Sequence, residues 1–332
     1  MKLQPTSGPD AQATLQSVTL PDDIVLPFQT IASGVLGRVV RLGGVVDTIL
    51  HKHAYPEPVS HALGEALALG ALLGAALKFN GRFILQTKTD GPLGFIVVNY
   101  DVPGKLRGYA NVPKARLAEL AGQGRGDQGA LIGHGHLAMT IDPGGDMERY
   151  QGIVALEGEP LVDAAHTYFR QSEQLPTFMR LAVARHFANG RWSWRAGGLL
   201  VQHVARTGGI TARAGETDEE RDQRLKGEDD EAWTRARLLA QTVEDHELLD
   251  PLLAPETLLY RLFHEEGVRV SPAVELSAKC RCSRDYIHDF LTQFGPSELA
   301  DMREPDGTVG VTCEFCSTRY AFEPSEVGLQ QL

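Results

Sequence analysis

Cysteine is missing from most of this 332-residue chain, and its four copies stand at positions 280, 282, 313 and 316. A chain that confines its thiols to two close pairs does not use them as general core residues. The GxxxxGK[ST] pattern of a P-loop is also absent, so nucleotide use through such a loop is unsupported. The longest apolar run, 66–77, is too short to cross a bilayer and is flanked by Glu65 and Lys78.

Positive charge is scarce as well. The chain has 32 Lys and Arg against 43 Asp and Glu, which gives a net charge of −11 and a pI near 5.5. This balance argues against a nucleic acid or an anionic membrane as the partner. The first residues, 1–16, lack the apolar stretch of a signal peptide, so we expect a cytoplasmic protein.

The spacing of the cysteines predicts a zinc site. Cys280-x-Cys282 and Cys313-x-x-Cys316 are two close pairs separated by 30 residues, the arrangement of a structural four-thiolate zinc centre. A strand-like CxC segment would place both sulfurs on one side, and a tight turn would bring the CxxC sulfurs together. Four unrelated buried cysteines, or a pair of structural disulfides, are the alternatives; nothing in the sequence points to an oxidising compartment.

Such a site would stabilise the C-terminal segment only while the metal is bound. The segment 276–332 is near the size at which a domain needs a metal or disulfides to stay folded. Structural zinc contributes about 10–16 kcal/mol of apparent folding free energy in small peptides. Basic residues near the thiols would favour reactive thiolates, although they are equally well read as solvated surface; they are Lys279, Arg281, Arg284 and Arg319. We expect an apolar shell around the metal from Phe315, Tyr320 and Phe322.

Upstream, the pattern predicts an α+β core domain over 23–205 after a polar N-terminal extension, 1–22. A small-residue helix is expected over 58–77, where Gly70 and Gly74 suggest close packing. Strands are expected over 83–89 and 93–99, joined by the turn at 90–92. The remaining expected elements are strands at 136–141, 150–156, 180–186 and 199–204 and a helix at 160–170.

Residues 206–275 read as an acidic insert followed by a helical linker. Gly215–Glu231 contains nine acidic and three basic residues, so we expect a solvated, mobile segment there. Apolar residues at helical spacing follow from Ala232, and Pro255 begins a second amphipathic pattern that Gly267 ends. The candidate linker and client-binding surface consists of Trp233, Leu239, Leu258, Leu259 and Phe263.

Histidines supply no second site. His134-x-His136 and the group His51, His53 and His61 could bind metal, but no carboxylate or cysteine stands at a supporting spacing. We expect them to be surface or turn residues. No catalytic residue is expected, because no acid–base pair or nucleophile motif is present.

With these motifs in place, the chain resembles the redox-regulated 33 kDa chaperonins. The resemblance covers about 24–325 and rests on the CxC…CxxC signature together with motifs upstream of it. Those motifs are Tyr55-Pro56-x-Pro58, Leu77-Lys78-Phe79, Asp90-Gly91-Pro92, Glu148-Arg149-Tyr150-Gln151-Gly152, Ser172-Glu173-Gln174-Leu175-Pro176-Thr177, Ala196-Gly197-Gly198 and Leu262-Phe263-His264-Glu265-Glu266. The extension, the glycine-rich stretch 122–133 and the insert 206–231 depart from the family pattern.

The resemblance implies an ATP-independent holdase that is not an enzyme. In the reduced state it would hold one Zn²⁺ per chain on Cys280, Cys282, Cys313 and Cys316 and be inactive. On oxidation it would lose zinc, form Cys280–Cys282 and Cys313–Cys316 disulfides, unfold its linker and its C-terminal zinc domain, 276–332, form a homodimer and bind unfolding proteins.

Two rival functions are open. A zinc-ribbon nucleic-acid binder is opposed by charge, since residues 280–332 hold four basic and nine acidic residues. A thiol–disulfide oxidoreductase would use the CxxC alone, usually at a helix N-terminus in a βαβ unit, whereas here it is paired with a second motif near the C-terminus.

Overall fold

The computed structural model describes residues 22–113, 116, 128–145, 147–173, 175–203 and 217–329. The expected N-terminal extension, apart from Asp22, lies outside the described residues, as do 122–127 of the glycine-rich stretch and 206–216 of the insert.

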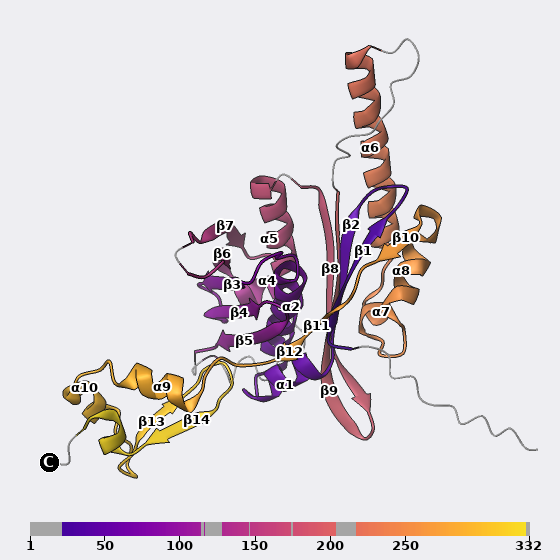
Figure 1. Cartoon of the computed structure of the whole chain (residues 1–332). Helices are drawn as coiled ribbons and strands as arrows, with labels where there is room; N and C mark the ends of the chain where they lie inside the picture. Colours follow the sequence, from indigo (N-terminus) through magenta and orange to yellow (C-terminus); the bar gives the residue numbers. More distant parts are fainter. Residues whose placement is uncertain are drawn as a thin grey trace, which may run out of the picture.

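Two six-stranded sheets form the body of the protein (Figure 1). The first has the order β10-β1-β2-β9-β8, with β11 also on β1; the second has the order β12-β5-β4-β3-β6-β7. The first sheet contains β1 (Ile24–Thr30), β2 (Leu36–Leu42), β8 (Thr177–Ala188), β9 (Arg191–Gln202), β10 (Val268–Val270) and β11 (Val274–Glu275). The second contains β3 (Arg82–Thr89), β4 (Phe95–Asp101), β5 (Lys105–Asn111), β6 (His134–Asp142), β7 (Tyr150–Glu157) and β12 (Ser277–Ala278).

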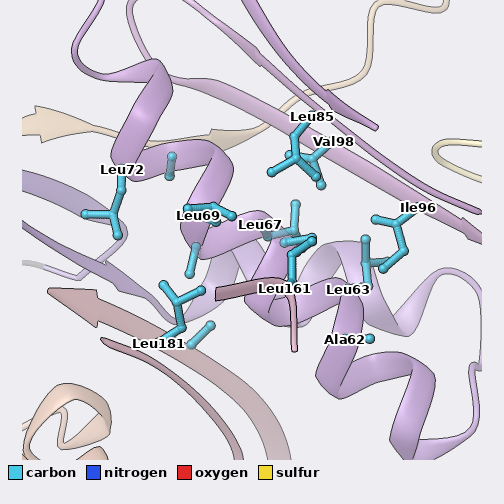
Figure 2. Close-up of a cluster of buried hydrophobic side chains, with 14 of the residues drawn as sticks. Ala62, Leu63, Leu67, Leu69, Leu72, Leu85, Ile96, Val98, Leu161 and Leu181 are labelled. Atoms are coloured by element: carbon cyan, nitrogen blue, oxygen red, sulfur yellow. The ribbon is translucent and has the colours of Figure 1, made fainter. Parts of the chain in front are cut away.

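Helix α2 (Glu57–Gly74) lies between the two sheets and is buried along almost its whole length. Its apolar residues meet side chains of both sheets, as Leu67, Leu85 and Leu181 illustrate (Figure 2). The glycines allow this approach: a Cβ on Gly70 would lie 2.7 Å from Val98, and one on Gly74 would lie 2.4 Å from the Tyr100 ring. The expected close packing of this helix is confirmed.

Smaller helices complete the central layer: α1 (Gly44–His51), α4 (Gln128–Ile132), α5 (Leu161–Tyr168) and the π-helical turn η1 (Phe169–Glu173). Helix α2 ends three residues earlier than the sequence predicts. At that point Ala76 and Leu77 donate to the carbonyls three residues back, which replaces the α-helical pattern by a tighter turn. The expected strands at 83–89, 93–99, 136–141 and 150–156 match observed strands within two residues at each end. The other two are longer than expected, since β8 begins three residues before 180 and β9 begins eight residues before 199. The α+β class is confirmed.

Three linker helices cover the outer face of the first sheet (Figure 1). They are α6 (Asp218–Gln241), α7 (Asp245–Leu249) and α8 (Pro255–Phe263), and the short η2 (His264–Glu266) follows. The expectation of a mobile segment over Gly215–Glu231 is wrong from Asp218 onward, because that stretch is the first part of α6. Glu, Gln, Arg and Lys, which are frequent in this stretch, are good helix formers.

The C-terminal module has a small core of its own. It contains α9 (Arg284–Leu291), α10 (Pro296–Asp301), the hairpin of β13 (Val309–Thr312) and β14 (Arg319–Phe322), and η3 (Pro324–Val327). Ser283 caps α9 by accepting a hydrogen bond from the Tyr286 backbone at 3.1 Å. The buried residues of this core are Ile287, Leu291, Leu299, Val309, Phe322, Val327 and Leu329. With so few apolar residues, the module depends on further cross-links for its stability.

Candidate metal centre

The CxxC motif forms the tight turn between β13 and β14. The Cys313 carbonyl accepts hydrogen bonds from the backbone N–H groups of Cys316 at 3.3 Å and Ser317 at 2.8 Å. The Cys313 N–H in turn donates to the Thr318 carbonyl at 2.9 Å, and Ser317 has a left-handed φ of 54° that reverses the chain. The expected turn is therefore confirmed, and it directs both thiols to one side.

The CxC motif lies between β12 and α9. Residues 279–283 have no regular secondary structure, so strand alternation does not place these two sulfurs as the sequence suggests. The segment is instead fixed at both ends, because the Lys279 N–H donates to Leu106 of β5 at 3.2 Å and Ser283 caps α9.

All four cysteine sulfurs lie in one cluster. They lie within 4.8 Å of one another; Cys280 Sγ is 3.7 Å from Cys313 Sγ, and Cys282 Sγ is 3.2 Å from Cys316 Sγ. Sulfurs bound tetrahedrally at about 2.3 Å from a cation would be about 3.8 Å apart. The cluster is thus positioned to bind a metal ion. Among the described residues, it is the only group of three or more potential ligands with this geometry.

The thiols differ in their surroundings. Burial opposes ionisation of Cys280, but hydrogen bonds from Cys282, Cys313 and Arg107 outweigh it and lower its pKa to about 7. Burial raises the pKa of Cys282 to about 12, although the Tyr320 hydroxyl donates to its sulfur at 3.3 Å. Burial is also the main reason why the pKa of Cys313 is raised. A bound cation would override these differences, because a coordinating thiol is deprotonated.

Two of the four basic residues singled out in the sequence have other partners. Arg284 forms a salt bridge with Glu326 and stacks on Phe322, and Arg319 pairs with Glu304 and Asp306. The guanidinium that reaches a sulfur comes from the core: Arg107 of β5 places Nη1 3.9 Å from Cys280 Sγ. The sequence gives no sign of this residue, since 173 positions separate the two.

The expected aromatic shell divides into three roles. Tyr320 hydrogen-bonds Cys282, and Phe322 is buried in the core of the module. Phe315 points toward the core domain, where its ring meets Arg107 and Tyr109.

The histidines are placed largely as expected, with two exceptions. His134 is exposed beside Asp90, and His51 pairs with Asp47. His61 is instead buried in α2 with its ring edge-on to Trp194. His53 contacts the CxxC turn, which the sequence does not foretell.

The candidate linker surface is covered. Leu258, Leu259 and Phe263 are almost fully buried, and Trp233 and Leu239 are partly buried. All five belong to one apolar cluster with residues of the first sheet and of the β1–β2 loop, which are Ile24, Leu26, Phe28, Val35, Val39, Ala182, Leu199 and Val201. Phe263 contributes a ring contact with Phe28 at 5.5 Å between centroids.

Arginines of the first sheet also hold the linker. Arg195 donates to the Leu249 carbonyl at 2.7 Å, and Arg41 donates to the carbonyls of Asp250 and Leu253. Both side chains are buried, so these hydrogen bonds carry weight. A Cβ on Gly197 would lie 2.4 Å from the Leu248 carbonyl, which shows how closely α7 approaches β9.

Comparisons with known proteins agree on one family. The Hsp33 protein family model matches residues 23–323. The 33 kDa chaperonin of Caulobacter vibrioides is 45% identical over 304 residues, which cover 91% of this chain and 95% of that protein. That of Azotobacter vinelandii is 38% identical over 298 residues, covering 88% of this chain and 89% of that protein.

A solved structure shares the fold. The 33 kDa chaperonin (heat shock protein 33 homolog) of Thermotoga maritima superposes with a TM-score of 0.68 at 24% identity, covering 92% of this chain and 96% of that chain. Across the part of the chain that the structure describes, no helix is both long and apolar enough to span a membrane. The sequence resemblance is confirmed by the family match: the chain belongs to the Hsp33 family, whose members are chaperones and not enzymes.

Proposed function

We propose that this chaperone is a redox-regulated, ATP-independent holdase, which binds unfolding proteins and prevents their aggregation under oxidative stress. The observation that carries the proposal is the meeting of four thiols, from two distant motifs, within 4.8 Å of one another. Such a cluster can exist either as a metal centre or as disulfides, and the two states constrain the chain differently.

In the resting state the four cysteines would hold one Zn²⁺. A closed four-thiolate site is typical of structural zinc, and the sulfur separations fit a tetrahedron. The bound cation would tie the CxC segment to the β13–β14 turn across the module, supplementing a core in which seven of the described residues are buried.

Oxidation would remove this tie. Each disulfide forms from two thiols with loss of two electrons and two protons, and hydrogen peroxide that accepts them becomes two molecules of water. We propose the pairs Cys280–Cys282 and Cys313–Cys316, which leave 280 and 316 unconnected. The nearest sulfurs in the reduced structure instead join the two motifs, so Cys280–Cys313 and Cys282–Cys316 are the competing pairs.

The linker would respond to oxidation because two parts of the protein hold it: the first sheet on which it packs, and the segment that leads to the cysteines. The segment 264–279 connects α8 to the cysteines and contains η2 and then the edge strands β10, β11 and β12. Short edge strands contribute little on their own, so unfolding of the module would loosen them and then α8. Helices as short as α7 and α8 are marginal without packing.

Release of the linker would expose the client-binding surface. Both the five linker residues and the face of the first sheet beneath them would become accessible as one apolar area. Such a surface would bind unfolded segments and could also pair two chains, so we propose a homodimer in the active state. We place the functional boundaries at 23–205, 206–275 and 276–332, and the protein in the cytoplasm.

The test is to measure zinc content and client aggregation on the same samples. The reduced protein should contain one zinc per chain and should not suppress aggregation of a thermally unfolding client. After peroxide at elevated temperature, zinc should be lost and suppression should appear. Full suppression by the reduced, metal-loaded protein would contradict redox control.

A further inference from the structure

The metal centre is seated against the edge of the second sheet. Strand β12 pairs in parallel with β5, with Ser277 opposite Lys105 and Ala278 opposite Leu106. This pairing ends two residues before Cys280, so β5 runs beside the first metal-ligating motif. Figure 1 shows the C-terminal module next to this end of the sheet.

Arg107 on β5 is held in place by the core. Its cross-strand neighbour is Asn99 of β4, which is buried. With the Asn99 amide oriented to satisfy its neighbours, its oxygen accepts hydrogen bonds from Arg107 Nε at 3.2 Å and Nη2 at 2.8 Å. The third nitrogen, Nη1, is left to face Cys280 Sγ at 3.9 Å. Among the described residues, no carboxylate forms a salt bridge with Arg107, so its charge is not neutralised by the core.

The module meets this guanidinium from the other motif as well. The Phe315 ring, between Cys313 and Cys316, lies 4.1 Å from Arg107 Cζ in a cation–π contact. Beside it, His53 Nε2 donates to the Phe315 carbonyl at 3.2 Å, and the Ser317 hydroxyl donates to His53 Nδ1 at 3.2 Å. Arg107 therefore contacts both cysteine motifs at once, through a sulfur of one and a ring of the other.

We propose that Arg107 is a positioning residue of the metal centre, through which the core domain stabilises the bound metal and the docked module together. The inference rests on the proposed four-thiolate zinc site. Four thiolates and a divalent cation form a dianionic centre, and a permanently charged guanidinium offsets part of that charge. A hydrogen bond to a metal-bound sulfur stabilises it as a ligand, and loss of such a partner costs about 10- to 100-fold in metal affinity.

Docking of the module and metal binding must affect each other equally, because the two equilibria are linked. If docking against Arg107 strengthens metal binding, then bound metal strengthens docking by the same factor. The core domain would therefore sense the state of the centre directly at β5, in addition to any signal that passes through the linker.

The experiment uses the full-length reduced protein and three variants. Arg107→Met keeps the apolar stem and removes the hydrogen bond and the charge. Arg107→Lys keeps the charge but loses the planar fork. Lys105→Met is the matched control, because it removes a positive charge from the same strand at a position opposite Ser277. Zinc affinity is measured by competition with a chromogenic chelator, and the cobalt-substituted protein reports the thiolate-to-metal charge-transfer band.

We expect Arg107→Met to weaken zinc binding about 10-fold or more and to shift the cobalt band to lower energy. Arg107→Lys should fall between it and the wild type, and Lys105→Met should match the wild type. Wild-type affinity and an unchanged band in Arg107→Met would overturn the inference. An equal loss in Lys105→Met would do the same, since it would reduce the effect to general charge.

A check of the fold and a substitute variant guard against unfolding of Arg107→Met. Since Arg107→Met leaves Asn99 without its partner, circular dichroism checks the fold. If the variant is unfolded, Phe315→Leu takes its place: it removes the ring on which the guanidinium stacks and should weaken zinc binding in the same direction, and unchanged affinity would refute the coupling. A wild-type protein that binds no zinc would overturn the proposed function itself, which separates that failure from a failure of Arg107.

Discussion

Truncation of Phe263 should switch on the chaperone without oxidation. Phe263 is fully buried at the end of α8, and its ring packs on Phe28 of β1. Phe→Ala changes at such sites cost about 3–5 kcal/mol. If that free energy is lost only from the docked linker, the population of the released linker rises by roughly two to four orders of magnitude, since each 1.4 kcal/mol is about a factor of ten.

Hydrogen exchange and client aggregation measure the two halves of this prediction. In reduced, zinc-loaded Phe263→Ala, amides of α8 should lose protection while those of β9 in the core keep theirs. The same sample should suppress aggregation of a thermally unfolding client in the absence of oxidant. Tyr260→Ala is the control, because Tyr260 lies on the same helix but is 68% exposed. It should behave as wild type.

Two outcomes would refute the reasoning. If α8 keeps its protection in Phe263→Ala, packing on Phe28 does not hold the linker. If protection is lost and aggregation is not suppressed, release of α8 is not sufficient for activity, and clients bind elsewhere.

The remaining predictions concern the thiols and the far end of the linker. Replacement of all four cysteines by serine should abolish zinc binding, and a variant that keeps stoichiometric zinc by elemental analysis would refute the site. Peptide mapping of the oxidised protein should find disulfides within each motif, and dominant Cys282–Cys316 linkages would contradict the switch. Burial alone would raise the pKa of Glu266, but hydrogen bonds from Arg235 and Ser33 lower it below its ordinary value of 4.5. The ionised Glu266 side chain therefore stabilises the fold fully above pH 4.5, and this stabilisation is lost as the pH falls through the lowered pKa of Glu266. Amide protection of α8 should decrease over that pH range. Glu266→Gln should remove this pH dependence.

Local patterns predict the metal centre well, because its chemistry is encoded in short motifs. The CxxC turn needs only Cys313, its neighbours and a residue that accepts a left-handed conformation at Ser317. The closely packed helix α2 is predictable for a related reason: Gly70 and Gly74 stand four residues apart on one helical face. In both cases the residues that form each motif are close in sequence, although their partners in the fold are not.

Contacts between residues that are far apart in the chain could not be predicted from the sequence. The short strands β10, β11 and β12 carry two or three residues each, too few to show an alternating pattern, and they exist because β1 and β5 offer open edges. Arg107 becomes a neighbour of Cys280 only through the β5–β12 pairing. The prediction of a mobile acidic run over 215–231 is wrong from Asp218 onward for a different reason. Its composition resembles that of a disordered segment, but most of its residue types favour a helix.

The helical state of that run changes the mechanical argument for the linker. A mobile segment before Trp233 would leave the first linker helix without support at its N-terminal side. Because α6 is continuous from Asp218 to Gln241, Trp233 lies inside a helix and not at its start. Undocking the linker therefore requires α6 to leave the sheet as a unit or to unfold from its C-terminal end, where Ala236, Ala240 and Val243 are fully buried. That end is followed directly by α7, which Arg41 and Arg195 hold to the core from both sides of the turn at Asp250. The contacts that resist release are thus concentrated between Ala236 and Phe263. Under the proposed mechanism, loss of the metal would have to act on that stretch through β10 to β12 or through the contact at Arg107.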